Sequence, residues 1–165
     1  MGYYSPASGV FGFGMHAAVV EIDPDTCDLT VLRYAILHDC GTVINPMVVE
    51  GQVHGGFAQG LAGAFWEQMA YDEDGQLLNA SFMDFLMPYA TEVPTPLVLH
   101  TETPSPLNPL GVKGVGEAGT IPVSAVIAGA VEDALGVPVD VMPLSPQRLF
   151  ELVTALERDA AAEGP

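Results

Sequence analysis

Basic residues are scarce in this chain. Lysine and arginine together number 4 against 21 aspartates and glutamates, which gives a formal net charge of −17. No basic patch is available to neutralise phosphates, so the composition argues against nucleic-acid binding. The same charge argues against adsorption to an anionic membrane surface. The acidity alone indicates solubility and names no partner.

Cysteine and long apolar runs are scarce as well. Cys27 and Cys40 have no CxxC spacing, which argues against a structural zinc site, and isolated cysteines in a cytosolic chain are more often free thiols. The longest apolar stretch, 43–66, is interrupted by a glutamate, a histidine and two glutamines, so it is no membrane span. The N-terminal MGYYSPASGVFGFG has neither the basic nor the apolar region of a signal peptide. We therefore expect a cytoplasmic protein.

The chain has enough apolar residues for one packed α+β domain. Hydrophobic residues make up 49% of the 165, which favours a core over disorder. Alternating apolar residues predict strands over 10–22 and 29–38, joined through a turn at 23–28 into an antiparallel hairpin.

A glycine-rich helix is expected next, from Pro46 to Met69, with Asn45 as its cap. Apolar residues recur every four positions and form one ridge. Five glycines, at 51, 55, 56, 60 and 63, lie off that ridge, and each costs about 1 kcal/mol relative to alanine. Such glycines indicate close approach by a ligand or another backbone, or tight packing of a buried helix.

Shorter elements follow in the second half. We expect a hairpin strand over 69–80 with its turn at 72–75, and an extended, proline-rich segment over 91–110 in which LVLHTET is most strand-like. A helix over 121–135 has Thr120 as a plausible cap and Gly136 as its stop. A last helix begins at Ser145 and Pro146 and runs to about Leu156.

The stretch GVKGVGEAG, residues 111–119, contains the chain's only lysine, Lys113, and Glu117 four residues later. A carboxylate just before a helix N-terminus beside a lysine could act as a tuned general base. The glycines could also turn backbone N–H groups toward an anion. The alternative is a purely structural turn in which Glu117 caps the next helix. The stretch is neither a P-loop nor a GxGxxG dinucleotide motif.

Other polar residues are weaker candidates. His16 and His38 lie in expected strands and fit half-buried structural histidines. Gln52 and Gln59 are seven residues apart and share a face of the glycine-rich helix, where a polar ligand could pair with their amides. No Ser-His-Asp arrangement is persuasive.

Two quoted segments carry a family resemblance: DCGTVINPMVVEGQVHGGFAQGLAGAFWEQMAYDEDGQLL and HTETPSPLNPLGVKGVGEAGT. They resemble the C-terminal part of the molybdenum-binding large subunit of the xanthine dehydrogenase / aldehyde oxidase family, closest to carbon-monoxide-dehydrogenase-like large chains. The resemblance covers about residues 3–155. It implies an α+β fragment of a larger molybdopterin-binding domain, with 1–157 as that domain and 158–165 as a frayed tail.

The resemblance also implies a chemistry. Family members hydroxylate a carbon centre, or oxidise CO, with water as the oxygen source. Their cofactor is molybdenum-molybdopterin, usually the cytosine dinucleotide form in bacteria, with FAD and 2Fe-2S clusters on partner subunits. By match, Glu117 is the general base at the metal's ligand. The residues that match the cofactor-contacting helix and loop are Gln52, Gly51, Gly55, Gly56, Lys113, Gly114 and Gly116.

The resemblance implies a chain that works with partners. A family large subunit is several times longer, so this chain reads as a fragment, a part of a split subunit or a truncated product. We expect it to need the remaining part of the large subunit and the FAD and iron–sulfur subunits, and to catalyse nothing alone. The substrate stays open among aldehydes, N-heterocycles, purines and CO. The alternative is a non-catalytic interaction module that binds no cofactor.

Overall fold

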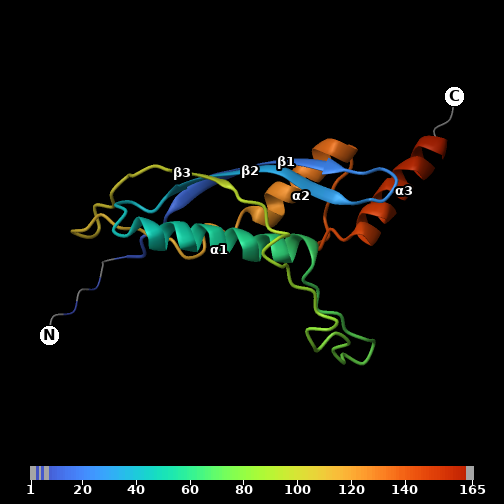
Figure 1. Ribbon diagram of the computed structural model, residues 1–165, viewed down its shortest axis with the longest axis horizontal. Helices are drawn as coiled ribbons and strands as arrows, with labels where there is room; N and C mark the ends of the chain where they lie inside the picture. Colours follow the sequence, from blue (N-terminus) through green and yellow to red (C-terminus); the bar gives the residue numbers. More distant parts are fainter. Residues whose placement is uncertain (1–2, 4, 6–7, 163–165) are drawn as a thin grey trace.

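The computed structural model describes residues 3, 5 and 8–162 and has an α+β architecture (Figure 1). Strand β1 (Phe13–Ile22) and strand β2 (Leu29–Asp39) form the expected antiparallel hairpin, with a register shift between Val19 and Val20. Strand β3 (Leu97–His100) pairs in parallel with β2. The sheet order is β1-β2-β3, so the sheet is mixed rather than purely antiparallel.

Helix α1 (Pro46–Phe65) begins where the sequence predicts. The side chain of Asn45 caps it by accepting a hydrogen bond from the Val48 amide at 3.2 Å. The helix ends four residues before the expected Met69. The amides of Trp66 and Glu67 both donate to the carbonyl of Ala62, at 2.9 and 2.8 Å, and this shared acceptor closes the last turn.

Helix α2 (Val123–Leu135) ends as expected at Gly136, which adopts the left-handed conformation with φ of 72°. The predicted cap, Thr120, was wrong. Its hydroxyl instead donates to the carbonyl of Gly56 on α1 at 2.9 Å, and the cap position is taken by Pro122, which makes no side-chain cap.

Helix α3 (Pro146–Ala162) has the expected cap, since Ser145 Oγ accepts from the Arg148 amide at 3.3 Å. It runs past Leu156 as far as Ala162, through most of the segment expected to be a frayed tail. Residues 163–165 lie outside the described part of the chain.

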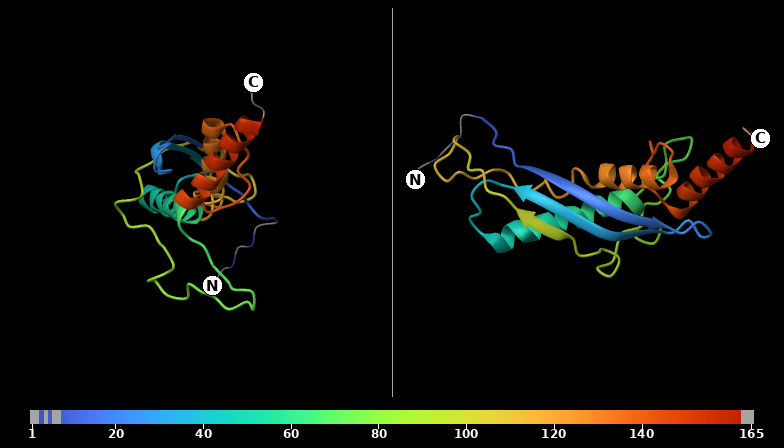
Figure 2. Two further views of the ribbon diagram at one scale, coloured as in Figure 1. Left: turned by 90° about the vertical axis from the view of Figure 1, so that its right-hand side faces the viewer. Right: turned by 90° about the horizontal axis from the view of Figure 1, so that it is seen from above.

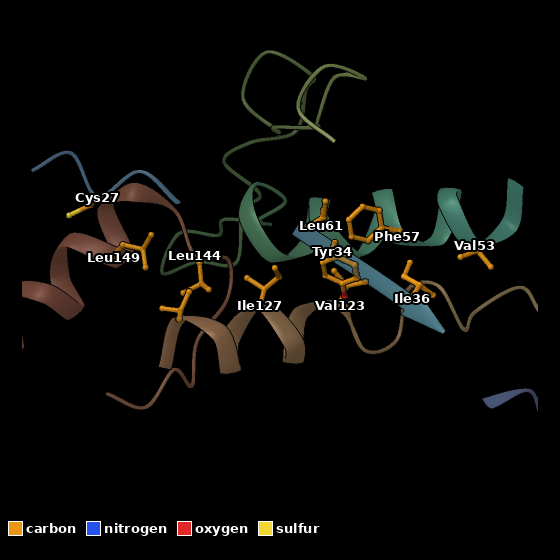
Figure 3. Close-up of a cluster of buried hydrophobic side chains, with 11 residues drawn as sticks. Cys27, Tyr34, Ile36, Val53, Phe57, Leu61, Val123, Ile127, Leu144 and Leu149 are labelled. Atoms are coloured by element: carbon orange, nitrogen blue, oxygen red, sulfur yellow. The ribbon is translucent and has the colours of Figure 1, made fainter. Parts of the chain in front are cut away.

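The core lies where α1 and α2 meet beneath the sheet (Figures 2 and 3). The expected apolar ridge of α1 supplies Val53, Phe57 and Leu61, which are fully buried. Val49 is also buried, while Phe65 at the helix end is half-buried. Tyr34 of β2 packs on Phe57 with ring centroids 4.4 Å apart. From α2 come three further buried residues, Val123, Ile127 and Val131.

The hairpin strand expected over 69–80 does not form. A single bridge between Tyr71 and Leu77 replaces it, although the turn at 72–75 is present and Asp72 Oδ1 accepts from the amides of Asp74 and Gln76. Both cysteines are free and buried. Within the described ranges, we find no helix with the length and apolar character needed to cross a bilayer.

Candidate functional site

The loop 111–119 lies against the middle of α1. A Cβ added to Gly119 would stand 2.6 Å from the carbonyl oxygen of Val53, and one added to Gly56 would stand 3.0 Å from the carbonyl carbon of Gly119. Contact this close requires glycine on both sides. The hydrogen bond from Thr120 to Gly56 fixes the same crossing. Gly56, predicted to contact a cofactor, thus meets the chain's own loop.

Glu117 is exposed at the end of this loop. Its carbonyl accepts hydrogen bonds from the amides of Thr120 at 2.9 Å and Ile121 at 3.1 Å, which makes the turn that leads into α2. No side chain caps α2, so Glu117 is not its cap. Within the described residues the Glu117 carboxylate has no hydrogen-bond partner, so it is free to act on a ligand.

Lys113 is bound to a buried carboxylate on the other side of the loop. Its Nζ lies 3.1 Å from Oδ1 of Asp39, and the Asp39 side chain is fully buried. Lys113 also donates to the hydroxyl of Thr103, and its Nζ lies 4.9 Å from the centroid of the Phe13 ring. Its charge therefore secures the loop to the ends of β1 and β2.

Asp39 is satisfied on all sides. Its carboxylate accepts from the Gly41 amide at 2.8 Å and from the hydroxyls of Thr101 at 3.2 Å and Thr103 at 2.9 Å. Burial, the largest influence, would raise the pKa of Asp39. The hydrogen bonds from Gly41, Lys113 and Thr103 and the charge of Lys113 outweigh it and lower the pKa to about 2. Asp39 is therefore a buried anion that holds its lysine.

Two further backbone hydrogen bonds hold the loop. The amide of Lys113 donates to the Cys40 carbonyl at 2.7 Å, and the amide of Gly114 donates to the Val10 carbonyl at 3.0 Å. An open pocket of about 550 Å³ lies between residues 8–10 and 108–114, and Lys113 and Gly114 form part of its wall.

His16 lies near the loop. Its Nδ1 lies 3.0 Å from the hydroxyl of Tyr34. Burial lowers the pKa of His16, and the backbone of Ala118, next to Glu117, opposes that shift. His38 lies in β2 as expected, but it is 1% exposed rather than half-buried, and its Nε2 has no hydrogen-bond partner within the described residues.

The outer face of α1 brings Gln52 next to the loop. Gly51, Gln52, Gly55 and Gln59 are exposed. The Gln52 Oε1 lies 3.7 Å from where a Cβ on Gly116 would stand. A Cβ on Gly51 or Gly55 would meet nothing within 4 Å. Packing within this chain therefore accounts for Gly56 but not for these two glycines.

Some residues of the site were not foreseen from the sequence. Asp39, Thr101 and Thr103 became visible only through their contacts with Lys113. A lone lysine beside an apolar core needs an acid partner, but the sequence does not say which of the 21 acids that partner is. Nothing in the local pattern indicated that His16 lies near the loop.

Comparisons with known proteins show the family to which the chain belongs. A family described as "Molybdopterin cofactor-binding domain" matches residues 2–94, more than half of the chain. The chain is 45% identical, over 80% of its length, to the carbon monoxide dehydrogenase large chain of Afipia carboxidovorans, covering 16% of that protein. It is 40% identical, over 90% of its length, to the gamma subunit of the 6-hydroxypseudooxynicotine dehydrogenase complex of Paenarthrobacter nicotinovorans, covering 19% of it.

A solved structure shows the same fold. The crystal structure of the Cu,Mo-CO dehydrogenase in its carbon monoxide reduced state matches 96% of this chain with a TM-score of 0.90 and 40% identity, and this chain covers 20% of that one. The chain thus spans about a fifth of the length of the relatives it matches. It belongs to the molybdopterin cofactor-binding family of carbon monoxide dehydrogenase large chains and xanthine dehydrogenase molybdenum-binding subunits.

Proposed function

We propose that this chain forms one wall of the cofactor site of a molybdenum hydroxylase, an enzyme that oxidises a small molecule with water as the oxygen source. The observation that carries the proposal is the meeting of two features: the bare glycine face of α1 and the loop that presents Glu117. Glycines that face open space on a helix cost stability, so a chain that keeps them beside a free carboxylate supports a ligand there.

The residues present fit a molybdenum-molybdopterin group. The backbone at Gly51 and Gly55 is open to close approach, and the exposed Gln52 amide can donate and accept hydrogen bonds beside it. The exposed backbone at Gly116 lies next to Gln52, while the exposed Gly114 lies nearer to Val10. When bound, the molybdenum supplies the two-electron oxidation that side chains alone do not perform.

Glu117 is the general base of this proposal. Its carboxylate is exposed and unpaired within the described chain, and the turn at Thr120 and Ile121 fixes its backbone. It accepts the proton released as water becomes the oxygen donor. Lys113 serves this base indirectly: it shapes the loop through Asp39, and its ammonium is engaged there. Gly56 contributes in the same indirect way, by letting the loop lie against α1.

The remaining parts of the enzyme lie outside this sequence. We propose that the rest of the large subunit, an FAD-binding subunit and an iron–sulfur subunit with 2Fe-2S clusters complete it, with the cofactor in its cytosine dinucleotide form. The relatives that match include a carbon monoxide dehydrogenase and a nicotine 6-hydroxylase, so the substrate class extends from CO to N-heterocycles and aldehydes. The compartment proposed is the cytoplasm.

The test is the change Glu117→Gln in the complex assembled with its partner subunits. Turnover on a panel of CO, aldehydes, purines and N-heterocycles should fall at least about 100-fold, because positioned proton transfer contributes about that much or more. Molybdenum content, measured by elemental analysis, should stay equal to that of the unaltered complex. The matched control is Glu21→Gln, an exposed glutamate of β1 far along the chain from the loop, which should keep full turnover.

Two results would contradict the proposal. Full turnover by the Glu117→Gln complex with molybdenum bound would remove Glu117 from catalysis. A correctly assembled complex without molybdenum would favour a non-catalytic interaction module instead.

A further inference from the structure

A long arm leaves the body of the molecule after α1. It comprises residues 69–89 and projects away from the sheet and helices before the chain returns to β3 (Figures 1 and 2). No residue between 67 and 92 is buried. The 69–89 arm therefore adds nothing to the core of this chain, and its shape must serve another contact.

The surface of the arm is apolar. Its most exposed side chains are those of Phe82, at 85% exposed, and Met83, at 90% exposed. Further exposed large apolar residues of the arm are Met69, Tyr71, Leu78, Leu86, Met87 and Tyr89. Monomeric proteins rarely leave such a group of side chains in water, and aromatic residues and methionine are enriched where protein interfaces form.

Charge on the arm is sparse and of one sign. The arm carries four acids and no lysine or arginine. Three of the acids, Asp72, Glu73 and Asp74, lie at its first turn, and Asp84 is alone among residues 78–89. The Ser81 hydroxyl donates to Asp84 at 3.3 Å. An apolar surface that supplies no basic group therefore suits the region around Phe82 and Met83.

The arm has its own fixed shape. At the base of the arm, the side chain of Asn79 accepts a hydrogen bond from the amide of Ala70 at 2.9 Å and donates one to the carbonyl of Gln68. The amide of Leu78 donates to the carbonyl of Ala70 at 2.8 Å. At the C-terminal end of the arm, the amide of Tyr89 donates to a carboxylate oxygen of Glu92 at 2.6 Å. These local bonds shape the arm before it meets a partner, which lowers the entropy cost of binding.

The comparison with a solved relative indicates what covers the arm. The Cu,Mo-CO dehydrogenase chain matches 96% of this chain, and the unmatched remainder is much shorter than the arm. The arm thus follows a path found in a protein of which this chain represents only 20%. The arm has no buried residue in this chain, and its path is shared with a much longer chain. Both facts fit an arm that is buried against the rest of the longer chain.

We propose that the 69–89 arm is a docking element, and that its exposed apolar residues Phe82 and Met83 are buried by the part of the molybdenum-binding large subunit outside this sequence. The inference rests on the proposed function only where it names the rest of the molybdenum-binding large subunit as the partner that covers the arm. It requires neither bound molybdenum nor turnover.

Thiol labelling tests it. The change Met83→Cys is made in the isolated chain and in a hybrid, in which this chain replaces the matching segment of the Afipia carboxidovorans carbon monoxide dehydrogenase large chain. Cys27 and Cys40 are buried and give a low background. Labelling by a maleimide should be at least tenfold slower in the hybrid than in the isolated chain. The control is Phe150→Cys, which places a thiol at an exposed position on α3. It measures how much slower labelling is in the hybrid at a site outside the arm.

A second measurement uses no introduced thiol, so its result does not depend on whether Met83→Cys distorts the arm. The double change Phe82→Ser with Met83→Ser should leave the melting temperature of the isolated chain unaltered, since neither side chain is buried there, and should lower that of the hybrid. Equal labelling in both proteins overturns the proposal, as does an unaltered melting temperature or an unfolded hybrid. Protection in the isolated chain that grows with concentration also overturns it, because a second copy then covers the arm. None of these readouts depends on Glu117, so this inference and the proposed function fail separately.

Discussion

Asp39 and Lys113 place opposite charges in a site almost free of water. The lysine side chain is 12% exposed and the aspartate is fully buried. Removing one partner of such a pair leaves an uncompensated buried charge, which costs far more than the pair itself contributes. The pair therefore acts mainly by fixing where the loop 111–119 leaves the sheet.

The change Lys113→Met tests this at the scale of one residue. We expect it to lower the free energy of unfolding by about 3–5 kcal/mol, because Asp39 remains buried without its cation. Urea unfolding of the isolated chain measures the effect. The control is Arg148→Met, which breaks the exposed pair with Glu151 on α3 and should cost at most about 1 kcal/mol. Equal losses in the two variants would refute a special role for Lys113.

The lowered pKa of Asp39 also predicts how the stability of the chain changes in acid. Its pKa is lowered from 3.8 to about 2 in the folded chain. A carboxyl with a lowered folded pKa stabilises the protein above its unfolded pKa, and that stability is lost as pH falls through the folded pKa. Between about pH 4 and pH 2, the unaltered chain should therefore lose more stability than Asp39→Asn. Unfolding curves at pH 5, 3 and 2 check this, and parallel losses would count against it.

Among the elements, α1 has two kinds of glycine. Gly60 is packed, since a Cβ there would lie 2.6 Å from the Cβ of Val123. Gly51 and Gly55 face open space. The same substitution should therefore have opposite signs on the two faces of one helix.

We expect Gly51→Ala and Gly55→Ala each to stabilise the isolated chain by about 0.5–1 kcal/mol, because alanine favours the helix and meets no neighbour. Gly60→Ala should destabilise it by about 1–3 kcal/mol through overpacking. Melting temperatures from circular dichroism distinguish the two signs. Gly129→Ala on α2, which also faces open space, should behave like Gly51→Ala. Destabilisation by Gly51→Ala would show that this face is already packed.

The elements also show how far the sequence can be read. Local signals placed the hairpin, the start of α1 at Asn45 and the end of α2 at Gly136, because caps and apolar periods act over a few residues. Thr120 was misread as a cap, since its hydroxyl bonds to Gly56, 64 residues away along the chain. Asp39 and Lys113 are 74 residues apart, and no local pattern could pair them.

The family motifs predicted more residues of the candidate site than local physics did. Local reasoning left Glu117 between a base and a helix cap, and the structure shows no side-chain cap on α2. Local reasoning also left the glycines of α1 between packing and a ligand. Packing accounts for Gly56 and Gly60, while Gly51 and Gly55 are open, so a ligand at those two glycines stays a prediction.

At the scale of the whole molecule, two of the exposed surfaces of this chain carry the proposals. One is the 69–89 arm, and the other is the site face, where Gln52, Gly55 and Glu117 are exposed. The relatives it matches are about five times longer, so both surfaces have polypeptide or cofactor available to cover them. The arm meets protein in this account, and the site face meets molybdopterin.

The most direct measurement is the molybdenum and pterin content of the assembled complex carrying Gly55→Leu. The leucine side chain extends into open space in this chain, so folding and assembly should persist. It would occupy the room assigned to the cofactor, and we predict that molybdenum and pterin fall together to a small fraction of the content with Gly129→Leu. Full molybdenum and pterin in the Gly55→Leu complex would contradict the account.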